Sequence, residues 1–333
     1  MITMPFYTET KNKRKIKGYI GIRERRAALL TPWKVYGILT SVMVVWGFNL
    51  AAVKYLLEFV DPVTLTAFRI LLAGVTVLII LASLGMIRWP KRSDWKYILL
   101  GALLNVVSHH YFLSQGLAIT SGTNAGLILG TGPMLTAVLV SLIMRNVPSR
   151  LQWLGVFIGF TGVATTVMVG SDSASGLSLG DVLVFISILA QVFSYIVIAN
   201  AARSLDPRLL TGYMLVTGAI VLFIIALIQE PGEIAAFAEV PSSFWLAFFF
   251  SGMLGTAVGH MLYNYSIGQA GPTKAAIFMN LNTLFSLVAA SLILGETITP
   301  GHLIGLVLIV IGVIFGSGAA EDILRKRRKR LSL

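Results

Sequence analysis

Residues 61–85 read DPVTLTAFRILLAGVTVLIILASLG, an Asp-Pro step followed by an apolar run whose one charged residue is Arg69. About 20 apolar residues in a helix cross the hydrocarbon layer of a membrane. The chain contains ten such runs, separated by short polar breaks. They are residues 33–57, 64–85, 95–117, 123–144, 150–170, 179–200, 209–228, 243–266, 273–294 and 301–319. This alternation predicts an all-α membrane protein with ten transmembrane helices.

The composition agrees with this class. Hydrophobic residues make up 56% of the chain and charged residues only 12%, well beyond what the core of a soluble protein requires. The chain has no cysteine, which excludes disulfides and thiolate metal ligands. The sequence also contains no phosphate loop, paired-carboxylate constellation or metal-ligand cluster. We therefore expect no cofactor and no metal, and we do not expect an enzyme.

Positive charge is confined almost wholly to one set of breaks and to the two tails. Apart from Lys54 and Arg69, every Lys and Arg lies there or at a neighbouring helix end. The opposite breaks contain no Lys or Arg; they are residues 58–63, 118–122, 171–178, 229–242 and 295–300. By the positive-inside rule the basic side faces the cytoplasm. This predicts a multi-pass protein of the cytoplasmic (inner) cell membrane with both termini cytoplasmic.

The net charge of +12 would suggest nucleic-acid binding in a soluble protein. Here the excess lies in the inner breaks and in two basic cytoplasmic tails, residues 1–32 and 320–333. Anionic lipids of the cytoplasmic leaflet attract basic side chains at such positions. We therefore expect membrane lipids, including anionic lipid at the tails, as partners, and no nucleic acid.

The two halves of the chain resemble each other. The Asp61-Pro62 step returns as Asp206-Pro207, an offset of 145, and after a five-residue insertion the offset becomes 150 and stays there. Each repeat holds five spans, an odd number, so the second copy is inverted in the membrane. We expect two inverted five-helix repeats, over residues 33–170 and 171–319. Inverted repeats are the architecture of alternating-access transporters.

Several motifs carry a resemblance to a known family. The first span contains Trp46-Gly47-Phe48-Asn49 followed by Lys54, and the second contains Phe68-Arg69-Ile70-Leu71-Leu72. Leu294-Gly295-Glu296 closes the ninth span. With these motifs the chain resembles the drug/metabolite transporter superfamily, in its ten-helix EamA-type branch, over about residues 33–318.

The resemblance implies a secondary transporter, most often an exporter of amino acids, metabolites or amphiphilic toxic compounds. It also implies a cavity between the two halves near the membrane midplane. The chain departs from the family at Thr283, where proline is frequent, and at Arg145-Asn146, where a Gly-Glu pattern would stand. The first departure affects a helix bend, and the second leaves the inner half without a counterpart of Glu296.

The candidate binding residues are polar groups deep in the spans. All 14 Asp and Glu lie in predicted tails, loops or helix ends, so histidines would carry any proton coupling near neutral pH. His110 and His260 occupy equivalent repeat positions, and polar residues at such depth are functional candidates. The predicted substrate-binding set is His110, His260, Asn264, Asn280, Asn282, Gln115, Trp46 and Asn49. The alternative is that these groups only form hydrogen bonds between helices.

Two cations form a separate candidate cluster. Lys54 and Arg69 lie in the outer part of their helices, and Glu296 is predicted to reach the same layer. The cations either bind a substrate carboxylate or form an ion-paired outer gate with Glu58, Asp61 or Glu296. We favour the gate, because a buried charge needs a partner.

The predicted function is secondary transport, with export of small organic metabolites. The alternative is an integral membrane enzyme or scaffold acting on lipid-like substrates. An enzyme would want acid-base groups at the membrane surface, where the inner loops offer only Asp94 and Asp206, and a scaffold has no need of an inverted repeat. Gly-x-x-x-Gly spacings such as 155–159, 301–305 and 312–316 indicate close helix packing. They suit one bundle or a dimer face, so monomer and homodimer both stay open.

Overall fold

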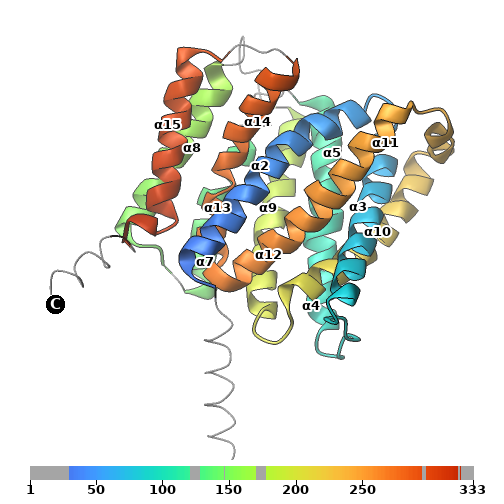
Figure 1. Cartoon of the computed structure of the whole chain (residues 1–333), viewed down its shortest axis with the longest axis horizontal. Coiled ribbons are helices and arrows are strands. Elements are labelled where there is room, and N and C mark those ends of the chain that lie inside the picture. Colours follow the sequence, from blue (N-terminus) through green and yellow to red (C-terminus); the bar gives the residue numbers. More distant parts are fainter. Residues whose placement is uncertain are drawn as a thin grey trace, which may run out of the picture.

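The computed structural model describes residues 30–120, 128–145, 147–169, 178–294, 298–321 and 323. Every regular element within these residues is a helix, which confirms the predicted all-α class (Figure 1). The first half contains α2 (Pro32–Leu56), α3 (Pro62–Ser83), α4 (Trp95–Gly101), η1 (Ala102–Ser108), α5 (His109–Ile119), α7 (Gly132–Met144) and α8 (Arg150–Val169). The second half contains α9 (Leu179–Ala201), α10 (Pro207–Gln229), η2 (Glu233–Ala238), α11 (Ser242–Phe249), η3 (Phe250–Val258), α12 (Gly259–Ala270), α13 (Pro272–Ile277), α14 (Asn280–Leu294) and α15 (Pro300–Gly316).

The helix starts follow from local chemistry. Five helices have proline as their first residue, where the missing N–H would have no partner within the helix anyway. At the start of α10 the Asp206 side chain accepts the Arg208 N–H. At the start of α15, Thr299 and His302 form a capping box, which gives His302 a structural role.

Six of the described helical stretches are long and apolar enough to cross a membrane. They are Pro32–Val53, Pro62–Ser83, Trp95–Gly116, Leu179–Ala201, Pro207–Gln229 and Ser242–Ala270. Two further apolar helices, Ile128–Met144 and Pro300–Gly316, are shorter. The predicted fourth span is partly outside the described residues, and the ninth is divided at Phe278 and Met279 into α13 and α14. The count of ten spans therefore stays a prediction.

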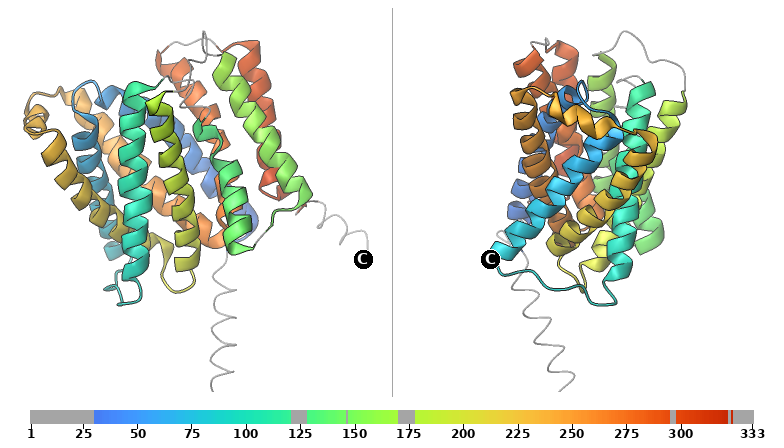
Figure 2. Two further views of the ribbon diagram at one scale, coloured as in Figure 1. Left: turned by 180° about the vertical axis from the view of Figure 1, so that it is seen from behind. Right: turned by 90° about the vertical axis from the view of Figure 1, so that its right-hand side faces the viewer.

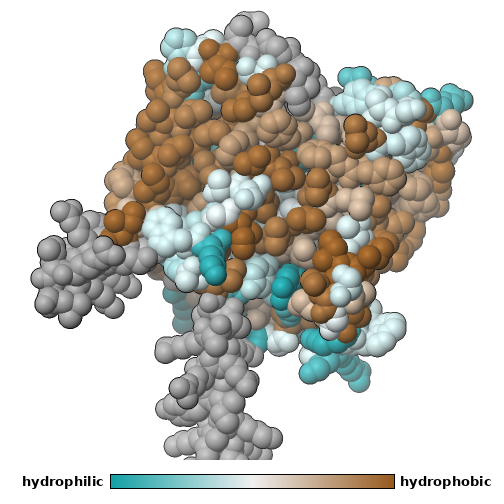
Figure 3. Space-filling view, viewed as in Figure 1, coloured by the Kyte–Doolittle hydropathy of each residue, from teal (hydrophilic) through white to brown (hydrophobic). Residues whose placement is uncertain are grey.

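The surface of the described helices is apolar. Ile79, Leu142, Leu292 and Ile304 all face outward, although each is a large hydrophobic side chain. Figure 3 shows hydrophobic residues over much of the molecule, with hydrophilic residues gathered toward the ends of the helices. Contiguous apolar surface of this extent is costly in water and favourable in lipid. The protein is a multi-pass membrane protein.

Glycines let α8 and α15 pack with their backbones in contact. A Cβ atom added at Gly155 would lie 2.1 Å from the Gly316 nitrogen, and one added at Gly162 would lie 2.8 Å from the Gly305 oxygen. Because the partner residue number falls as the α8 residue number rises, the two helices run antiparallel. They form one end of the molecule, while α3 and α10 lie toward the other (Figures 1 and 2).

Two π-helical segments interrupt otherwise α-helical stretches: η1 lies between α4 and α5, and η3 lies between α11 and α12. η1 leads directly into His109 and His110, and η3 leads directly into Gly259 and His260. A π-helical stretch widens the turn and displaces the side chains that follow it, and such stretches occur frequently at functional sites. The two histidines predicted to be equivalent therefore both follow a widened stretch of helix.

Candidate functional site

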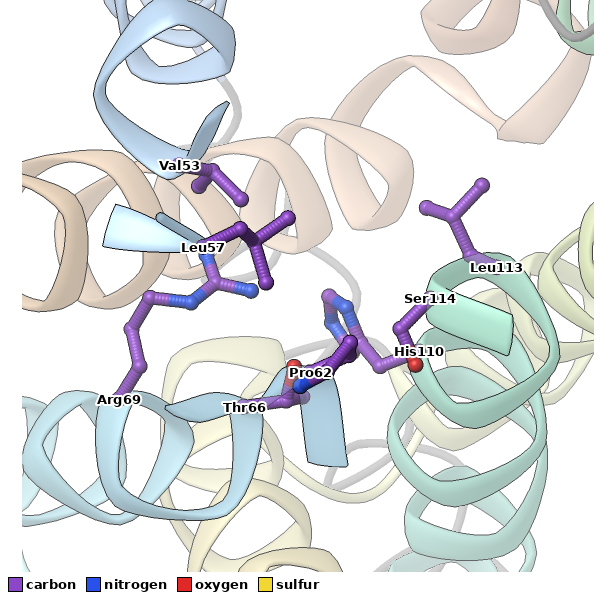
Figure 4. Close-up of a pocket in the computed structure, with 8 residues that line it drawn as sticks. All are labelled: Val53, Leu57, Pro62, Thr66, Arg69, His110, Leu113 and Ser114. Atoms are coloured by element: carbon purple, nitrogen blue, oxygen red, sulfur yellow. The ribbon is translucent and has the colours of Figure 1, made fainter. Parts of the chain in front are cut away.

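A cavity of about 260 Å³ lies between three helices of the first half (Figure 4). It is formed where α2 ends and α3 begins, facing the middle of α5. Its lining residues are Val53, Leu57, Pro62, Thr66, Arg69, His110, Leu113 and Ser114. Of the predicted functional residues, Arg69 and His110 therefore line one cavity.

Arg69 is a buried cation in this lining. Its residue is 7% exposed, and its Nη1 atom donates to Ser251 Oγ and Thr256 Oγ1, each at 3.3 Å. Its Nε has no hydrogen-bond partner among the described residues. Within the same part of the chain, no carboxylate forms an ion pair with it, whereas Arg88 pairs with Asp94 and Arg208 pairs with Asp206.

The predicted ion-paired gate is only partly visible. Glu296 and the side chain of Lys54 lie outside the described residues. Glu58 and Asp61 are exposed, and neither forms an ion pair with Arg69. The gate stays a prediction.

The two histidines that were predicted to be equivalent are in contact. The ring centroids of His110 and His260 are 5.8 Å apart. His260 in turn lies 5.1 Å from Trp46, whose Nε1 donates to the Gly255 oxygen at 2.8 Å. The Nε2 atom of His110 is buried and has no hydrogen-bond partner in the described part of the chain. His110, His260 and Trp46 thus form one contact group that links α5, α12 and α2.

His109 has a different environment from its neighbour His110. Its Nε2 lies 2.9 Å from Gln191 Nε2, and its Nδ1 lies 2.9 Å from Ser187 Oγ. Both ring nitrogens therefore have partners on α9. The ring joins the two halves of the chain, which is a structural role.

The predicted asparagines do not gather around the cavity. Asn264 is fully buried and donates through Nδ2 to Thr211 Oγ1 at 3.0 Å. Asn280 faces α8, because a Cβ atom added at Gly159 would lie 2.3 Å from Asn280 Nδ2. Asn49 packs against Gly255. The structure therefore places these residues at three separate helix contacts.

Several of these amides keep unsatisfied polar atoms. Within the described residues, both amide atoms of Asn280 and the Oδ1 atoms of Asn49, Asn264 and Asn282 have no hydrogen-bond partner. Each buried polar atom without a partner costs stability, so these amides are positions where a water molecule or a ligand would be stabilising. Gln115 lies on α5, half-buried, outside the lining of the cavity.

Sequence reasoning missed three hydroxyl groups of this site, those of Thr66, Ser251 and Thr256. Ser251 and Thr256 bind Arg69, and Thr66 and Ser114 line the cavity. Serine and threonine are common in membrane helices, where they often bond to their own backbone, so their residue types gave no signal. The depth of Arg69 was the one clue that polar partners must exist.

Carboxylates surround the start of α3, beside the mouth of the cavity. Glu230 Oε1 accepts the Val63 N–H at 3.0 Å, and Glu233 Oε1 accepts the Asp61 N–H at 2.9 Å. Burial, together with repulsion from Glu233 and Glu230, raises the pKa of Asp61 above its usual value. This end of α3 is thus fixed by the segment that follows α10, in the other half of the chain.

A model of the EamA-like transporter family matches residues 33–168 and again residues 178–317. The chain belongs to the EamA-like transporter family. Membership confirms the resemblance to the drug/metabolite transporter superfamily that the motifs indicated. This EamA-like protein is a membrane transporter of small solutes.

Relatives of this EamA-like protein are similar over most of their length. The uncharacterized transporter YyaM of Bacillus subtilis is 29% identical over 276 residues, covering 81% of this chain and 88% of that protein. A WAT1-related chloroplastic protein of Arabidopsis thaliana is 23% identical, covering 83% of this chain and 67% of its own. A crystal structure of a protein with 15% identity covers 86% of this chain and 97% of its own, with a TM-score of 0.72. That likeness concerns the fold alone.

Proposed function

We propose that this EamA-like protein is a secondary transporter that exports small organic metabolites across the cytoplasmic membrane by alternating access. Amino acids, related metabolites and amphiphilic compounds are the proposed cargo. The proposal includes ten transmembrane helices in two inverted repeats, residues 33–170 and 171–319, with both termini cytoplasmic. The separate matches of the family model to residues 33–168 and 178–317 support this division.

One observation carries the proposal: the contacts between α8 and α15 are reciprocal. At an offset of 150, Gly155 corresponds to Gly305 and Gly162 to Gly312. A Cβ at Gly155 would lie 2.7 Å from the Gly312 oxygen, and a Cβ at Gly305 would lie 2.8 Å from the Gly162 oxygen. Each contact becomes the other when the repeats are exchanged. A two-fold axis between antiparallel membrane-crossing helices lies in the membrane plane, which is the symmetry of an inverted repeat.

Contacts near the centre support the same relation. Residues on a two-fold axis meet their own equivalents, and His110 meets His260. At offsets of 145 and 150, the contact of Gln191 with His109 corresponds to that of Trp46 with Gly259. In the contact with Gly259 the large indole ring of Trp46 lies against a glycine. In the contact with His109 the shorter amide of Gln191 lies against an imidazole. The two repeats thus fill equivalent space with different pairs of side chains.

The cavity lies where α2 ends and α3 begins, at the side of the molecule that is proposed to face outward, which supports an outward-open state. At the opposite end of α2, the Tyr36 ring stacks on Phe278 at 5.5 Å, and its hydroxyl donates to the Ser317 oxygen at 3.2 Å. In the proposed cycle the two repeats exchange conformations, so this contact opens while the cavity near Asp61 closes. The His110–His260 pair stays near the axis in both states.

The residue roles follow from this cycle. The proposed substrate-binding residues are His110, His260, Asn264, Asn280, Asn282, Gln115, Trp46 and Asn49. Lys54, Arg69 and Glu296 form the proposed gate when the outer side closes. Proton coupling would pass through the central histidines, and anionic lipids would bind the two basic tails.

Transport and alternating access can be tested in one system. Overexpressing cells would be screened for growth under amino-acid, dipeptide and antimetabolite stress, and the solute that the protein protects against would be followed as efflux. The native chain has no cysteine, so a Leu57→Cys, Leu113→Cys pair can be cross-linked across the cavity without background. A short thiosulfonate cross-linker should stop efflux, and reduction should restore it.

The matched controls are the two single-cysteine variants, which should keep their efflux after the same treatment. Efflux that continues at its full rate after complete cross-linking of the pair contradicts alternating access. Growth indistinguishable from cells with an empty vector, across the whole screen, contradicts export of these solutes.

A further inference from the structure

We propose that the cavity between α2, α3 and α5 binds the carboxylate of an amphiphilic organic monoanion, with Arg69 as its counter-charge. The inference rests on the transport function proposed above and names its substrate class. The cavity measures about 260 Å³. A cavity of about 150 Å³ accommodates benzene, so this one has room for a small aromatic or branched aliphatic acid.

The environment of Arg69 calls for an anion. Its guanidinium is nine-tenths buried and has two neutral hydroxyl partners, Ser251 and Thr256, each accepting from the same nitrogen, Nη1. The Nε donor has no partner among the residues that the structure describes, and none of their carboxylates pairs with the charge. A buried charge without a counter-ion is strongly disfavoured. In Figure 4 the guanidinium of Arg69 points toward the cavity.

The repeat indicates that packing does not require this charge. At offsets of 145 and 150, Arg69 corresponds to Met214, and its partner Ser251 corresponds to Gly101. Met214 contacts Gly101, with the sulfur 3.0 Å from where a Cβ at that glycine would lie. An apolar side chain of similar length thus occupies the equivalent place in the other half. The guanidinium is therefore specific to the half that holds the cavity, which favours a role in binding.

The rest of the lining indicates a monoanion with an apolar body. His110 adds a second nitrogen, Nε2, without a partner in the described chain, and Thr66 and Ser114 add hydroxyls. Val53, Leu57 and Leu113 form an apolar wall. Among the described residues no carboxylate lines the cavity, so a cationic head group would meet Arg69 without a compensating partner. The ammonium group of a zwitterion would likewise have no compensating partner. We therefore expect monocarboxylates to bind more tightly than amino acids.

The test compares three probes of one shape on the purified full-length protein. Phenylacetate, phenylacetamide and phenethylamine share an aromatic body and differ in the charge of the head group. We expect saturating phenylacetate to raise the Tm by about 2 °C or more, because a ligand that binds only the folded state stabilises it. The amide and the amine should leave the Tm within the error of the measurement. An equal rise with the amide, or no rise with phenylacetate, overturns the proposal.

Substitutions test whether the phenylacetate-induced rise in Tm comes from binding in this cavity. Arg69→Gln should abolish the phenylacetate shift, whereas Arg88→Gln, which removes a cation outside the cavity, should retain it. Leu113→Trp fills the cavity and leaves Arg69 in place, so it should also abolish the shift and serves if Arg69→Gln does not fold. A phenylacetate shift that survives in Leu113→Trp places the binding elsewhere and overturns the proposal.

The outcome separates this site from the transport function. Binding is measured in detergent without any gradient, and transport is measured as efflux from cells. Efflux without phenylacetate binding contradicts the anion site and leaves the transport proposal intact. Binding at Arg69 without efflux of any screened solute retains the site and counts against export.

Discussion

Glu230 Oε2 accepts two hydrogen bonds from Thr64, one from the backbone N–H and one from the side-chain hydroxyl, each at 2.7 Å. The acceptor lies just beyond α10, while the donor lies in the first turn of α3, 166 residues away in the sequence. A negative charge at a helix N-terminus interacts favourably with the helix dipole and satisfies N–H groups that have no partner in the helix. One carboxylate thus ties the two halves together beside the cavity.

Removing this carboxylate should destabilise the protein. We expect Glu230→Ala to lower the free energy of unfolding by about 1–2 kcal/mol, as the loss of a helix cap does. The measurement is the Tm in detergent. Glu239→Ala is the matched control, because Glu239 is exposed at the end of η2, and it should change the Tm little. Equal losses in the two variants would show that the cap is not the cause.

The carboxyl group of Asp94 should give acid-dependent stability. Burial opposes its ionisation, but hydrogen bonds from the Lys91 N–H and the Arg88 guanidinium outweigh burial and lower the pKa of Asp94. Because the folded-state pKa of Asp94 lies below its unfolded-state pKa, its contribution is present above the unfolded-state pKa and is lost as the pH falls through the folded-state pKa. Asp94→Asn should therefore cost about 1–3 kcal/mol at pH 7 and progressively less in acid. A constant difference in Tm from pH 7 down to about 3 would contradict the linkage.

Asp61 should show the opposite dependence. Burial and the neighbouring Glu233 and Glu230 raise the pKa of Asp61, so the folded state binds its proton more tightly than the unfolded chain. Its contribution is present below the unfolded pKa and is lost as the pH rises through the folded one. Asp61→Asn, compared with the wild type, should gain Tm as the pH rises from about 3.5 to 7. The gain should be small, because Asp61 is only slightly buried and most of it is exposed to solvent screening. A relative loss of Tm over that range would refute the assignment.

Gly155 and Gly37 provide a matched test of helix packing. Gly155→Ala places a methyl group 2.1 Å from the Gly316 nitrogen, so α8 and α15 must separate, and we expect a loss of more than about 2 kcal/mol. Nothing lies within 4 Å of a Cβ at Gly37, in α2. Gly37→Ala should be neutral or stabilising by up to about 1 kcal/mol, from helix propensity alone. Thermal unfolding in detergent measures both, and equal Tm values for the two variants would contradict the close contact.

Alanine variants of the neighbours His109 and His110 should have different effects, the first mainly on stability and the second mainly on efflux. His109→Ala leaves Gln191 and Ser187 without their partner, so we expect a loss of about 1–3 kcal/mol in stability. His110→Ala removes a ring whose Nε2 has no partner in the described chain, so the Tm should change less while efflux falls at least tenfold. Normal efflux by His110→Ala at every pH from about 5.5 to 8 would make this histidine structural.

The sequence predicted the helices well where apolar length and proline decide them. α4 begins at Trp95 and α9 at Leu179, as the runs beginning at residues 95 and 179 indicated. The π-helical η1 and η3 were not predictable, because one extra residue in a turn leaves no mark on an apolar run. The division of the ninth run at Phe278 and Met279 was also hidden, since it occurs without a proline.

The candidate site was predicted in part. Depth and repeat position singled out His110 and His260, which are in contact, and Arg69, which lines the cavity with His110. Asn280 faces Gly159 on α8 instead, and the sequence alone does not show which neighbouring helix a side chain of α14 meets. The partners of Arg69 on η3 depend on how two distant helices pack, which no local pattern encodes.

The unequal pairs at the equivalent positions, Gln191 with His109 and Trp46 with Gly259, have a thermodynamic consequence. If the repeats were identical, the inward-facing and outward-facing states would have the same energy, and an unloaded transporter would divide its time evenly between them. In the proposed exchange an indole would stand where an amide had been bonded to an imidazole, so the two states would differ in energy. In the proposed cycle the empty protein would therefore have a preferred resting side.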